Sequence, residues 1–417
     1  MKRGFLFAII LFALLLLAIR FVGENHYKVE PQTIPAFAVN PDTTIFKSVQ
    51  ALLDKADSPA ESMFYPLADP HLALISRIQL ADNAVESIDV QYYLFHDDDV
   101  GRALLRALVE ATERGVKVRL LLDDMDVGGR EGLFTKLAAD NKNLEVRVFN
   151  PSWLRTFKPL EYLARFPRVT RRMHNKSFTV DKISSVVGGR NVGNEYFDVN
   201  TEVAFTDFDI LASGAISRDV TKEFDAYWHS GLAYDVAHLG GSISDAGYMV
   251  WSIQLETDLG KYREIIAKSK DLITDRMMRA ELKPYYDRGE VIFDRPDKVI
   301  TPLLDQSGHL APTIMKLMGS AKEKLLIASP YFIPGEVGMK LFRDLRERDV
   351  EVIILTNSLA ANDVAAVHSG YMDYRRELLE IGVQLYEMKA FNRDHSLSFL
   401  GSKNASLHAK SFIVDQR

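Results

Sequence analysis

Hydrophobic residues in the first half of the chain alternate between short apolar runs and a longer stretch with a helical period. The short runs at residues 88–95, 116–122 and 144–149 are typical of buried strands. Between the first two runs, apolar residues recur at helical spacing until Arg114-Gly115 ends the predicted helix. The order strand, helix, strand, helix, strand indicates an α/β domain. The helical stripe consists of Ala103, Leu104, Leu105, Ala107, Leu108 and Ala111.

The second half of the chain repeats this pattern. The apolar run at 326–333 contains adjacent aromatic residues, as the run at 88–95 does, and an apolar helical stripe follows it. Further strands are expected at 350–355 and 383–386. The same α/β domain is therefore expected twice. The second helical stripe consists of Met339, Leu341, Phe342 and Leu345.

An eight-residue signature occurs once in each half, with the spacing H-x-K-x4-D. The two copies share six of their eight positions, and such a match does not arise by chance. On a strand, residues two apart face the same way, so each copy offers an imidazole and an ammonium group to one cleft. The signature residues are His174, Lys176 and Asp181 in the first copy, and His408, Lys410 and Asp415 in the second.

Two histidines and two lysines, without cysteine or clustered carboxylates, favour phosphoryl transfer without a metal. One neutral imidazole attacks phosphorus, and the other, as an imidazolium, protonates the leaving oxygen. Two ammonium groups hold the non-bridging oxygens. The expected intermediate is a phosphohistidine.

The composition limits the classes of protein and of site. The 417 residues, 47% of them hydrophobic, suffice for two ordinary domains. With 51 Lys and Arg against 57 Asp and Glu, the net charge is -6, so nothing in the average composition attracts nucleic acid. The chain has no cysteine, which excludes disulfides, thiolate zinc sites and a catalytic cysteine. The other histidines have no metal-binding spacing, so no metal or cofactor is expected.

The N-terminus contains a membrane-insertion signal. Lys2 and Arg3 precede an apolar run at residues 5–19, which Arg20 closes. The length lies between that of the hydrophobic region of a signal peptide and that of a transmembrane helix, and we favour an uncleaved anchor over a cleaved signal. The positive charge before the run predicts that the N-terminus stays inside and that most of the chain lies outside.

The motifs together resemble the phospholipase D superfamily, and most closely the bacterial cardiolipin synthases of the C type. Besides the two signatures, the resemblance rests on Asp89-Val-Gln-Tyr-Tyr93, Leu120-Leu-Leu-Asp-Asp124, Val187-Gly-Gly-Arg-Asn191 and Leu355-Thr-Asn-Ser-Leu-Ala-Ala-Asn-Asp363. It implies two pseudo-symmetric α/β domains with mixed sheets flanked by helices, which share one active site and follow an N-terminal hydrophobic helix.

The resemblance also implies roles for individual residues. His174 would be the nucleophile or the acid, with His408 as its partner. Lys176, Lys410 and Asn191 would donate hydrogen bonds to the phosphate. Glu202 stands where the family has a carboxylate that orients a histidine, whereas Asp181 and Asp415 are expected to tie down strand ends.

The function implied is that of a phosphatidyltransferase in the bacterial cell membrane, with its catalytic part on the periplasmic side. It would make cardiolipin from phosphatidylglycerol and a phosphatidyl donor, either phosphatidylglycerol or phosphatidylethanolamine. A phosphodiester hydrolase of the phospholipase D type and a non-catalytic lipid-binding fragment are the alternatives. A nuclease is disfavoured by the acidic composition and the membrane signal.

The second domain is expected to be incomplete at its C-terminus. By the spacing of the first copy, the counterparts of Asn191 and Glu202 would fall beyond Arg417, so we expect a fragment of a longer protein. The expected divisions are a signal anchor or transmembrane helix at 1–23, a linker at 24–44, a first phospholipase D-like domain at 45–235, a connector at 236–302 and a second such domain at 303–417.

Two further regions are candidates for contact with lipid. Arg172, beside the first signature, and Thr356, Asn357 and Ser358, at the carboxyl end of a predicted strand, are candidate substrate-binding residues. Apolar residues at helical spacing lie between 153 and 163, interleaved with basic ones, and indicate either an interfacial helix or an ordinary core-facing helix. The apolar residues are Trp153, Phe157, Leu160 and Leu163, and the basic ones are Arg155, Lys158, Arg165 and Arg168.

Overall fold

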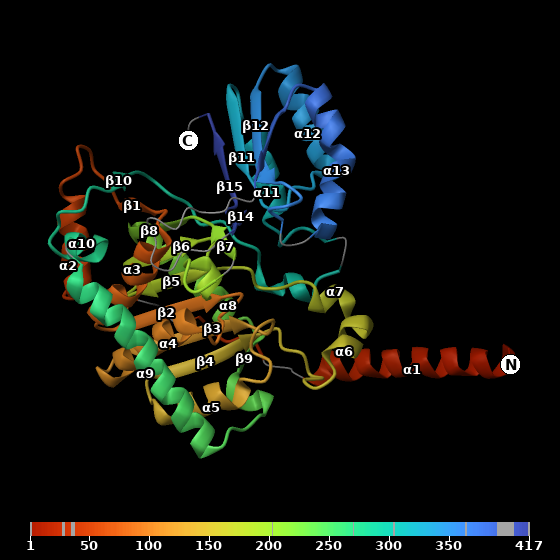
Figure 1. Ribbon diagram of the computed structural model, residues 1–417, viewed down its shortest axis with the longest axis horizontal. Coiled ribbons are helices and arrows are strands. Elements are labelled where there is room, and N and C mark those ends of the chain that lie inside the picture. The colour runs from red at the N-terminus through yellow and green to blue at the C-terminus, as the bar shows by residue number, and fades with distance from the viewer. Residues whose placement is uncertain are drawn as a thin grey trace.

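A nine-stranded mixed sheet forms the centre of the first half (Figure 1). The structure is a computed structural model that describes residues 2–26, 30–34, 38–201, 203–269, 271–302, 305–362, 365–389 and 404–415. In the order of the sheet, the strands are β10 (Tyr285–Tyr286), β1 (Ser62–Leu67), β8 (Asp209–Gly214), β6 (Ser184–Gly188), β5 (Ser177–Val180), β2 (Ser87–Tyr92), β3 (Lys117–Asp123), β4 (Leu144–Phe149) and β9 (Ala233–Asp235).

Helices cover both faces of this sheet, which explains why its central strands are continuous apolar runs. On β3, Leu120 and Leu122 pack into the main core together with Leu104 of α4. Leu121, between them, points to the opposite face and packs with Phe224 of α8. The helices here are α2 (Thr44–Leu53), α3 (Pro70–Asn83), α4 (Asp99–Glu113), α5 (Glu131–Asp140), α6 (Lys158–Ala164), α7 (Phe166–Val169) and α8 (Ala215–Trp228).

The second half contains a four-stranded sheet of the same design. Its order is β13 (Gln384–Met388), β12 (Glu351–Asn357), β11 (Lys324–Ala328) and β15 (Ser411–Val414). The first three strands are parallel and β15 is antiparallel to β11, just as β2, β3 and β4 are parallel and β5 is antiparallel to β2. The expected α/β repeat is confirmed. The helices are α11 (Ala311–Gly319), α12 (Gly335–Glu347) and α13 (Ala365–Glu380).

The segment between the halves packs on the first half. It contains α9 (Asp245–Lys268), α10 (Ile273–Met278) and β10, with the short helix η3 (Pro296–Val299) before the second half. α9 lies along α4, and β10 extends the large sheet by pairing with β1.

A small two-stranded sheet connects the two halves. β7 (Val203–Thr206) of the first half pairs in parallel with β14 (Asn404–Leu407) of the second, with Thr206 opposite Leu407. Strands β7 and β14 therefore end side by side. The residues that follow them, Asp207 and His408, meet at the junction of the two halves.

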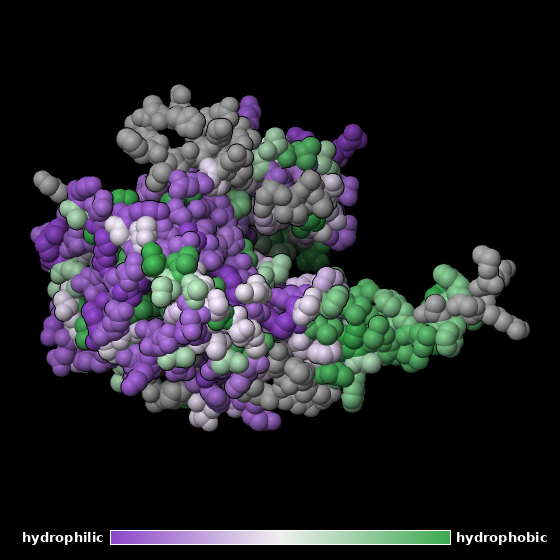
Figure 2. All heavy atoms as spheres, turned by 60° about the horizontal axis from the view of Figure 1, so that its bottom comes forward, coloured by the Kyte–Doolittle hydropathy of each residue, from purple (hydrophilic) through white to green (hydrophobic). Residues whose placement is uncertain are grey.

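The N-terminal helix α1 (Lys2–His26) projects from the body of the molecule (Figures 1 and 2). Its stretch Phe5–Gly23 has 19 residues and a mean hydropathy of 2.9, so it is long and apolar enough to cross a membrane. The stretch is also almost entirely exposed. Figure 2 shows this apolar surface beside the mostly hydrophilic body. An N-terminal hydrophobic helix is thus present, as expected.

Candidate active site

The first signature contains β5, and its histidine and lysine come just before the strand. His174 and Lys176 precede the strand, which begins at Ser177, so neither residue lies on the strand that is expected to carry them. Their side chains still meet: the Lys176 ammonium donates to the His174 carbonyl over 2.6 Å, and its Nζ lies 3.3 Å from His174 Nδ1. The ring of Tyr93 stacks on His174 with the centroids 4.1 Å apart. Stacking fixes the plane of the imidazole.

In the second signature, the histidine and lysine likewise come just before β15, and the lysine contacts the other ring nitrogen. Lys410 Nζ lies 3.0 Å from the His408 carbonyl oxygen and 3.4 Å from His408 Nε2. It also lies over the ring of Tyr331, as Lys176 lies over that of Tyr93. The pseudo-symmetry of the two halves therefore extends to the side chains that surround each imidazole.

Charge effects show that the two signatures converge. Desolvation within the cleft, followed by the charges of Lys176, Lys410 and His408, lowers the pKa of His174 to about 3. Groups of the second half can act on His174 only if they share its cleft. His174 is thus a neutral imidazole at neutral pH, as a nucleophile must be.

The two ammonium groups also act on each other. Burial, and then the charge of Lys410, lowers the pKa of Lys176 to about 7, although Asp207, Asp209 and Asp123 oppose this shift. Two like charges in one cleft form a site for an anion, because a bound phosphate offsets their repulsion.

His408 is oriented by a carboxylate from the other half of the chain. Asp207 follows β7 and His408 follows β14, so the parallel register of these strands brings the two residues together. Asp207 Oδ2 lies 2.6 Å from His408 Nδ1, and the Asp207 side chain is fully buried. The carboxylate keeps a proton on Nδ1, directs Nε2 toward Lys410, and compensates the charge when Nε2 also carries a proton.

The Gly-Gly-Arg-Asn stretch after the first signature makes room for Asp207 and holds it. A side chain at Gly189 would collide with the Asp207 carboxylate, so only glycine permits this close approach. The buried guanidinium of Arg190 donates to the carbonyl of Asp207 over 2.7 Å and pairs with Asp209. Gly189 and Arg190 of this motif therefore hold the Asp207 carboxylate in place.

Asp181 and Asp415 occupy equivalent turns. The Asp181 carboxylate accepts the backbone N–H groups of residues 85–87 at the start of β2. Asp415 accepts those of residues 322–324 at the start of β11. Each aspartate therefore ties the end of a signature strand to the start of its neighbour.

Asn191, which follows the first signature in the chain, is buried. Its Oδ1 accepts the N–H of Leu94 over 3.2 Å, which fixes the side chain and leaves the amide nitrogen as its donor. Glu202, the expected orienting carboxylate, lies outside the residues that the structure describes.

The four candidate substrate-binding residues are all buried or half-buried, and three of them bond to the scaffold. Arg172 is buried and forms an ion pair with Asp123 over 2.7 Å. Asn357 exchanges two hydrogen bonds with the backbone of Leu407, just before His408, and so positions β14. Thr356 is buried on β12. Ser358 is half-buried, and its N–H donates to a neighbouring strand.

Most of the chain is similar to known proteins. The family described as "Cardiolipin synthase, PLD-like domain" matches residues 76–228 and 314–417, which include both signatures. Cardiolipin synthase C of Escherichia coli is 37% identical over 366 residues, or 86% of this chain and 76% of that protein. The chain belongs to the phospholipase D-like cardiolipin synthase family.

Other relatives agree with this membership. The major cardiolipin synthase of Bacillus subtilis is 24% identical over 80% of this chain and 55% of its own length. The crystal structure of the phosphatidylserine synthase of Haemophilus influenzae has the same fold, with a TM-score of 0.54 and 14% identity over 89% of this chain and 81% of that one. The expected fold class, and the expected class of enzyme, a phospholipase D-like phosphatidyltransferase, are confirmed.

In this family member, an apolar cavity of about 490 Å³ opens beside the first signature. His174 and Lys176 stand at its edge, and apolar side chains from β8, α8 and the segment before η3 form most of its wall. Among them are Ile210, Ala212, Ile216, Val220, Val291 and Phe293. Glu223, at the same cavity, accepts a hydrogen bond from Asn175, and burial raises its pKa to about 7.

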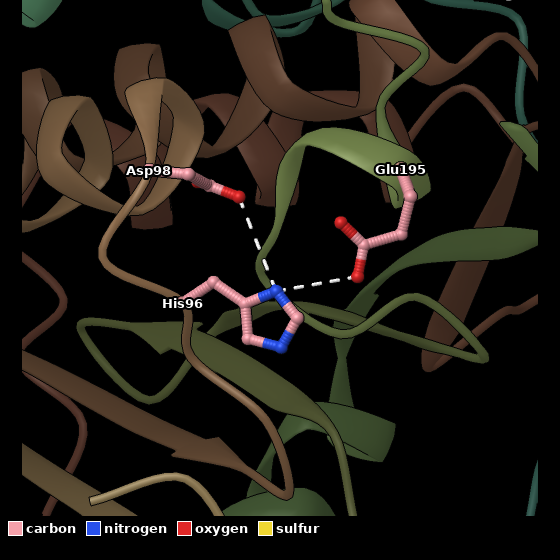
Figure 3. A group of neighbouring side chains, drawn as sticks. All are labelled: His96, Asp98 and Glu195. Carbon is pink, nitrogen blue, oxygen red and sulfur yellow. Dashed lines mark ion pairs between the residues drawn. The ribbon is translucent and has the colours of Figure 1, made fainter. Parts of the chain in front are cut away.

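His96, Asp98 and Glu195 form a further group whose nitrogen and oxygen atoms are of the kind that bind divalent cations (Figure 3). His96 Nδ1 lies 3.2 Å from Glu195 Oε1, and this hydrogen bond raises the pKa of His96. The Asp98 carboxylate already caps α4 and accepts the N–H of Asn194 over 2.7 Å. We therefore assign the group to loop packing.

Proposed function

We propose that this protein is a membrane-bound phosphatidyltransferase that forms cardiolipin through a phosphatidyl-His174 intermediate. The donor is phosphatidylglycerol or phosphatidylethanolamine, and the acceptor is the free glycerol hydroxyl of phosphatidylglycerol. Membership of the cardiolipin synthase family supports the reaction, and the geometry of the two signatures supports the order of its steps.

In the first step, the neutral His174 imidazole attacks the phosphorus of the donor. A phosphorus–nitrogen bond forms as the bond to the head-group oxygen breaks, and His408 gives its Nε2 proton to the departing alcohol. The pKa of His174, lowered to about 3, suits it to attack, whereas the carboxylate beside His408 compensates a protonated ring. We therefore assign His174 as the nucleophile and His408 as the acid.

In the second step, His408 acts as a base. It removes the proton from the acceptor hydroxyl, whose oxygen attacks phosphorus while the bond to His174 breaks. Lys176, Lys410 and the amide of Asn191 hold the non-bridging oxygens throughout. The product is cardiolipin, and the enzyme returns to its starting protonation state.

The apolar cavity beside His174 and Lys176 is the observation that supports a lipid substrate. A phosphodiester bound between the two ammonium groups would place one acyl chain of the phosphatidyl group next to this apolar wall, where burial of each methylene contributes about 0.8 kcal/mol. A free head group has no acyl chain that such a cavity would bury.

We further propose that the protein resides in the bacterial cell membrane with its catalytic part on the periplasmic side. The apolar stretch Phe5–Gly23 supports membrane insertion, and Lys2 and Arg3 before it favour a cytoplasmic N-terminus.

Lipid analysis of a cardiolipin-free bacterial host tests the reaction. Expression of this chain should produce cardiolipin, and expression of its His174→Ala variant at equal membrane level should not. Phosphatidic acid in place of cardiolipin would show a hydrolase. Cardiolipin from the His174→Ala variant would refute the proposed nucleophile.

A further inference from the structure

The segment of α6 and α7 has its ionic side chains inside and its large apolar side chains outside. Glu161 is fully buried and pairs with Arg165, one turn along the helix. Phe157, Leu163 and Phe166 are all more than half exposed. A core-facing helix has the opposite pattern, so the expected alternative of an ordinary core helix does not describe this segment. Exposed aromatic and leucine side chains indicate contact with something apolar.

This segment lies against the base of the hydrophobic helix α1 (Figure 1). Gly23 of α1 approaches Trp153 and Arg165 so closely that a side chain there would collide with both. Ile19, one turn earlier, is buried in the same contact region. Because the apolar stretch of α1 ends at Gly23, a helix packed here lies where a membrane-spanning α1 leaves the bilayer.

Arginines line a cavity of about 270 Å³ at the same place. Arg20 comes from α1, Arg168 from α7, and Arg171 from the loop that follows α7. Arg168 donates to the side-chain oxygen of Asn150 over 3.0 Å, and Arg171 donates to backbone carbonyls of η3 and the loop after it. These partners are neutral, so they orient the guanidinium groups without cancelling their charge.

We propose that α6, α7 and the adjoining end of α1 form a membrane-surface site that binds the phosphate of an anionic phospholipid. Phe157, Leu163 and Phe166 enter the interface, while Arg20, Arg168 and Arg171 hold the head-group phosphate. The described residues that line this cavity do not include the four signature side chains, so the site is distinct from the catalytic one. The proposal requires α1 to span the membrane but does not depend on the proposed transferase reaction.

The absence of cysteine from the sequence permits a direct test on the full chain. Phe166→Cys carries an environment-sensitive fluorophore on the proposed surface, and Met249→Cys carries it on α9, which lies at the left of Figure 1 while α1 projects to the right. The two positions are matched in exposure, at 63% and 64%. Each labelled protein is reconstituted through α1 into vesicles of phosphatidylcholine, with or without phosphatidylglycerol and with a head-group quencher lipid.

We expect quenching of the Phe166 probe but not of the Met249 probe, and more quenching when phosphatidylglycerol is present. Adding Arg168→Gln should lower the ratio of docked to undocked segment by about fivefold in the anionic vesicles. If the Phe166 probe is quenched no more than the Met249 probe, the proposal that α6 and α7 contact the membrane surface is wrong. Quenching that is equal in neutral vesicles and unaffected by Arg168→Gln would overturn the phosphate site. Unchanged circular dichroism and an unchanged Met249 signal confirm that the variant is folded.

Discussion

Replacement of Asp207 by Asn tests the contact between the two halves. The variant keeps the size of the side chain but removes the charge that lies 2.6 Å from His408 Nδ1 in a fully buried position. A hydrogen bond to a charged group contributes about 1.5–3 kcal/mol. Because 1.36 kcal/mol corresponds to about a factor of ten in rate, kcat should fall by about 10- to 150-fold. KM should change little, since Asp207 acts through His408.

The assay is cardiolipin formation from phosphatidylglycerol in mixed micelles, with Asp181→Asn as the matched control. Asp181 is also a buried carboxylate, but its bonds go to backbone N–H groups at the start of β2. The control should lose stability while its folded fraction keeps its kcat. The reasoning fails if Asp207→Asn retains kcat within about threefold of the parent, or if both variants lose kcat equally.

Three further predictions follow from the site. The kcat/KM for phospholipid should fall as pH rises through about 7, because Lys176 loses its proton there. Lys176→Arg should move this decline to higher pH, and an unchanged pH profile would contradict the role of Lys176 as a charged phosphate-binding group. Ile210→Trp, which fills the apolar cavity, should raise KM for long-chain phosphatidylglycerol by about 200-fold if four fewer methylenes are buried, but leave short-chain turnover unchanged; equal effects on both would exclude an acyl pocket. Asn357→Ala should lower the free energy of unfolding by about 2–4 kcal/mol, because it leaves the buried N–H and C=O of Leu407 unpaired. Denaturant titration in micelles measures this change, and an unchanged midpoint would refute the role of Asn357 in holding β14.

Much of the fold could be predicted from the sequence because it is encoded locally. The apolar runs of the two halves correspond to β2, β3 and β4 and to β11, β12 and β13, in the same order. The two signatures identified His174, Lys176, His408 and Lys410, whose spacing is fixed within eight residues of chain. Periodicity and motif spacing report interactions between residues that are near in sequence.

The sequence did not reveal Asp207, because its partner is 201 residues away and the contact depends on the pairing of β7 with β14. Tyr93 was part of a recognised stretch, but only the fold shows that its ring stacks on His174. Arg172 is expected in the cleft because it lies beside the first signature. Asn357 is expected there because it lies at the carboxyl end of a predicted strand. Their bonds to Asp123 and Leu407 are tertiary contacts, which sequence position does not show.

The measurement that tests the central claim most directly is the capture of the covalent intermediate. The full chain in micelles is mixed with phosphatidylglycerol and denatured at mildly alkaline pH, where both the phosphorus–nitrogen bond and the acyl esters survive. Its peptides are then analysed by mass spectrometry. We predict a phosphatidyl adduct on the peptide that contains His174, and no adduct in the His174→Ala variant. An adduct on His408 instead, or cardiolipin formation without any adduct, would contradict the proposed mechanism.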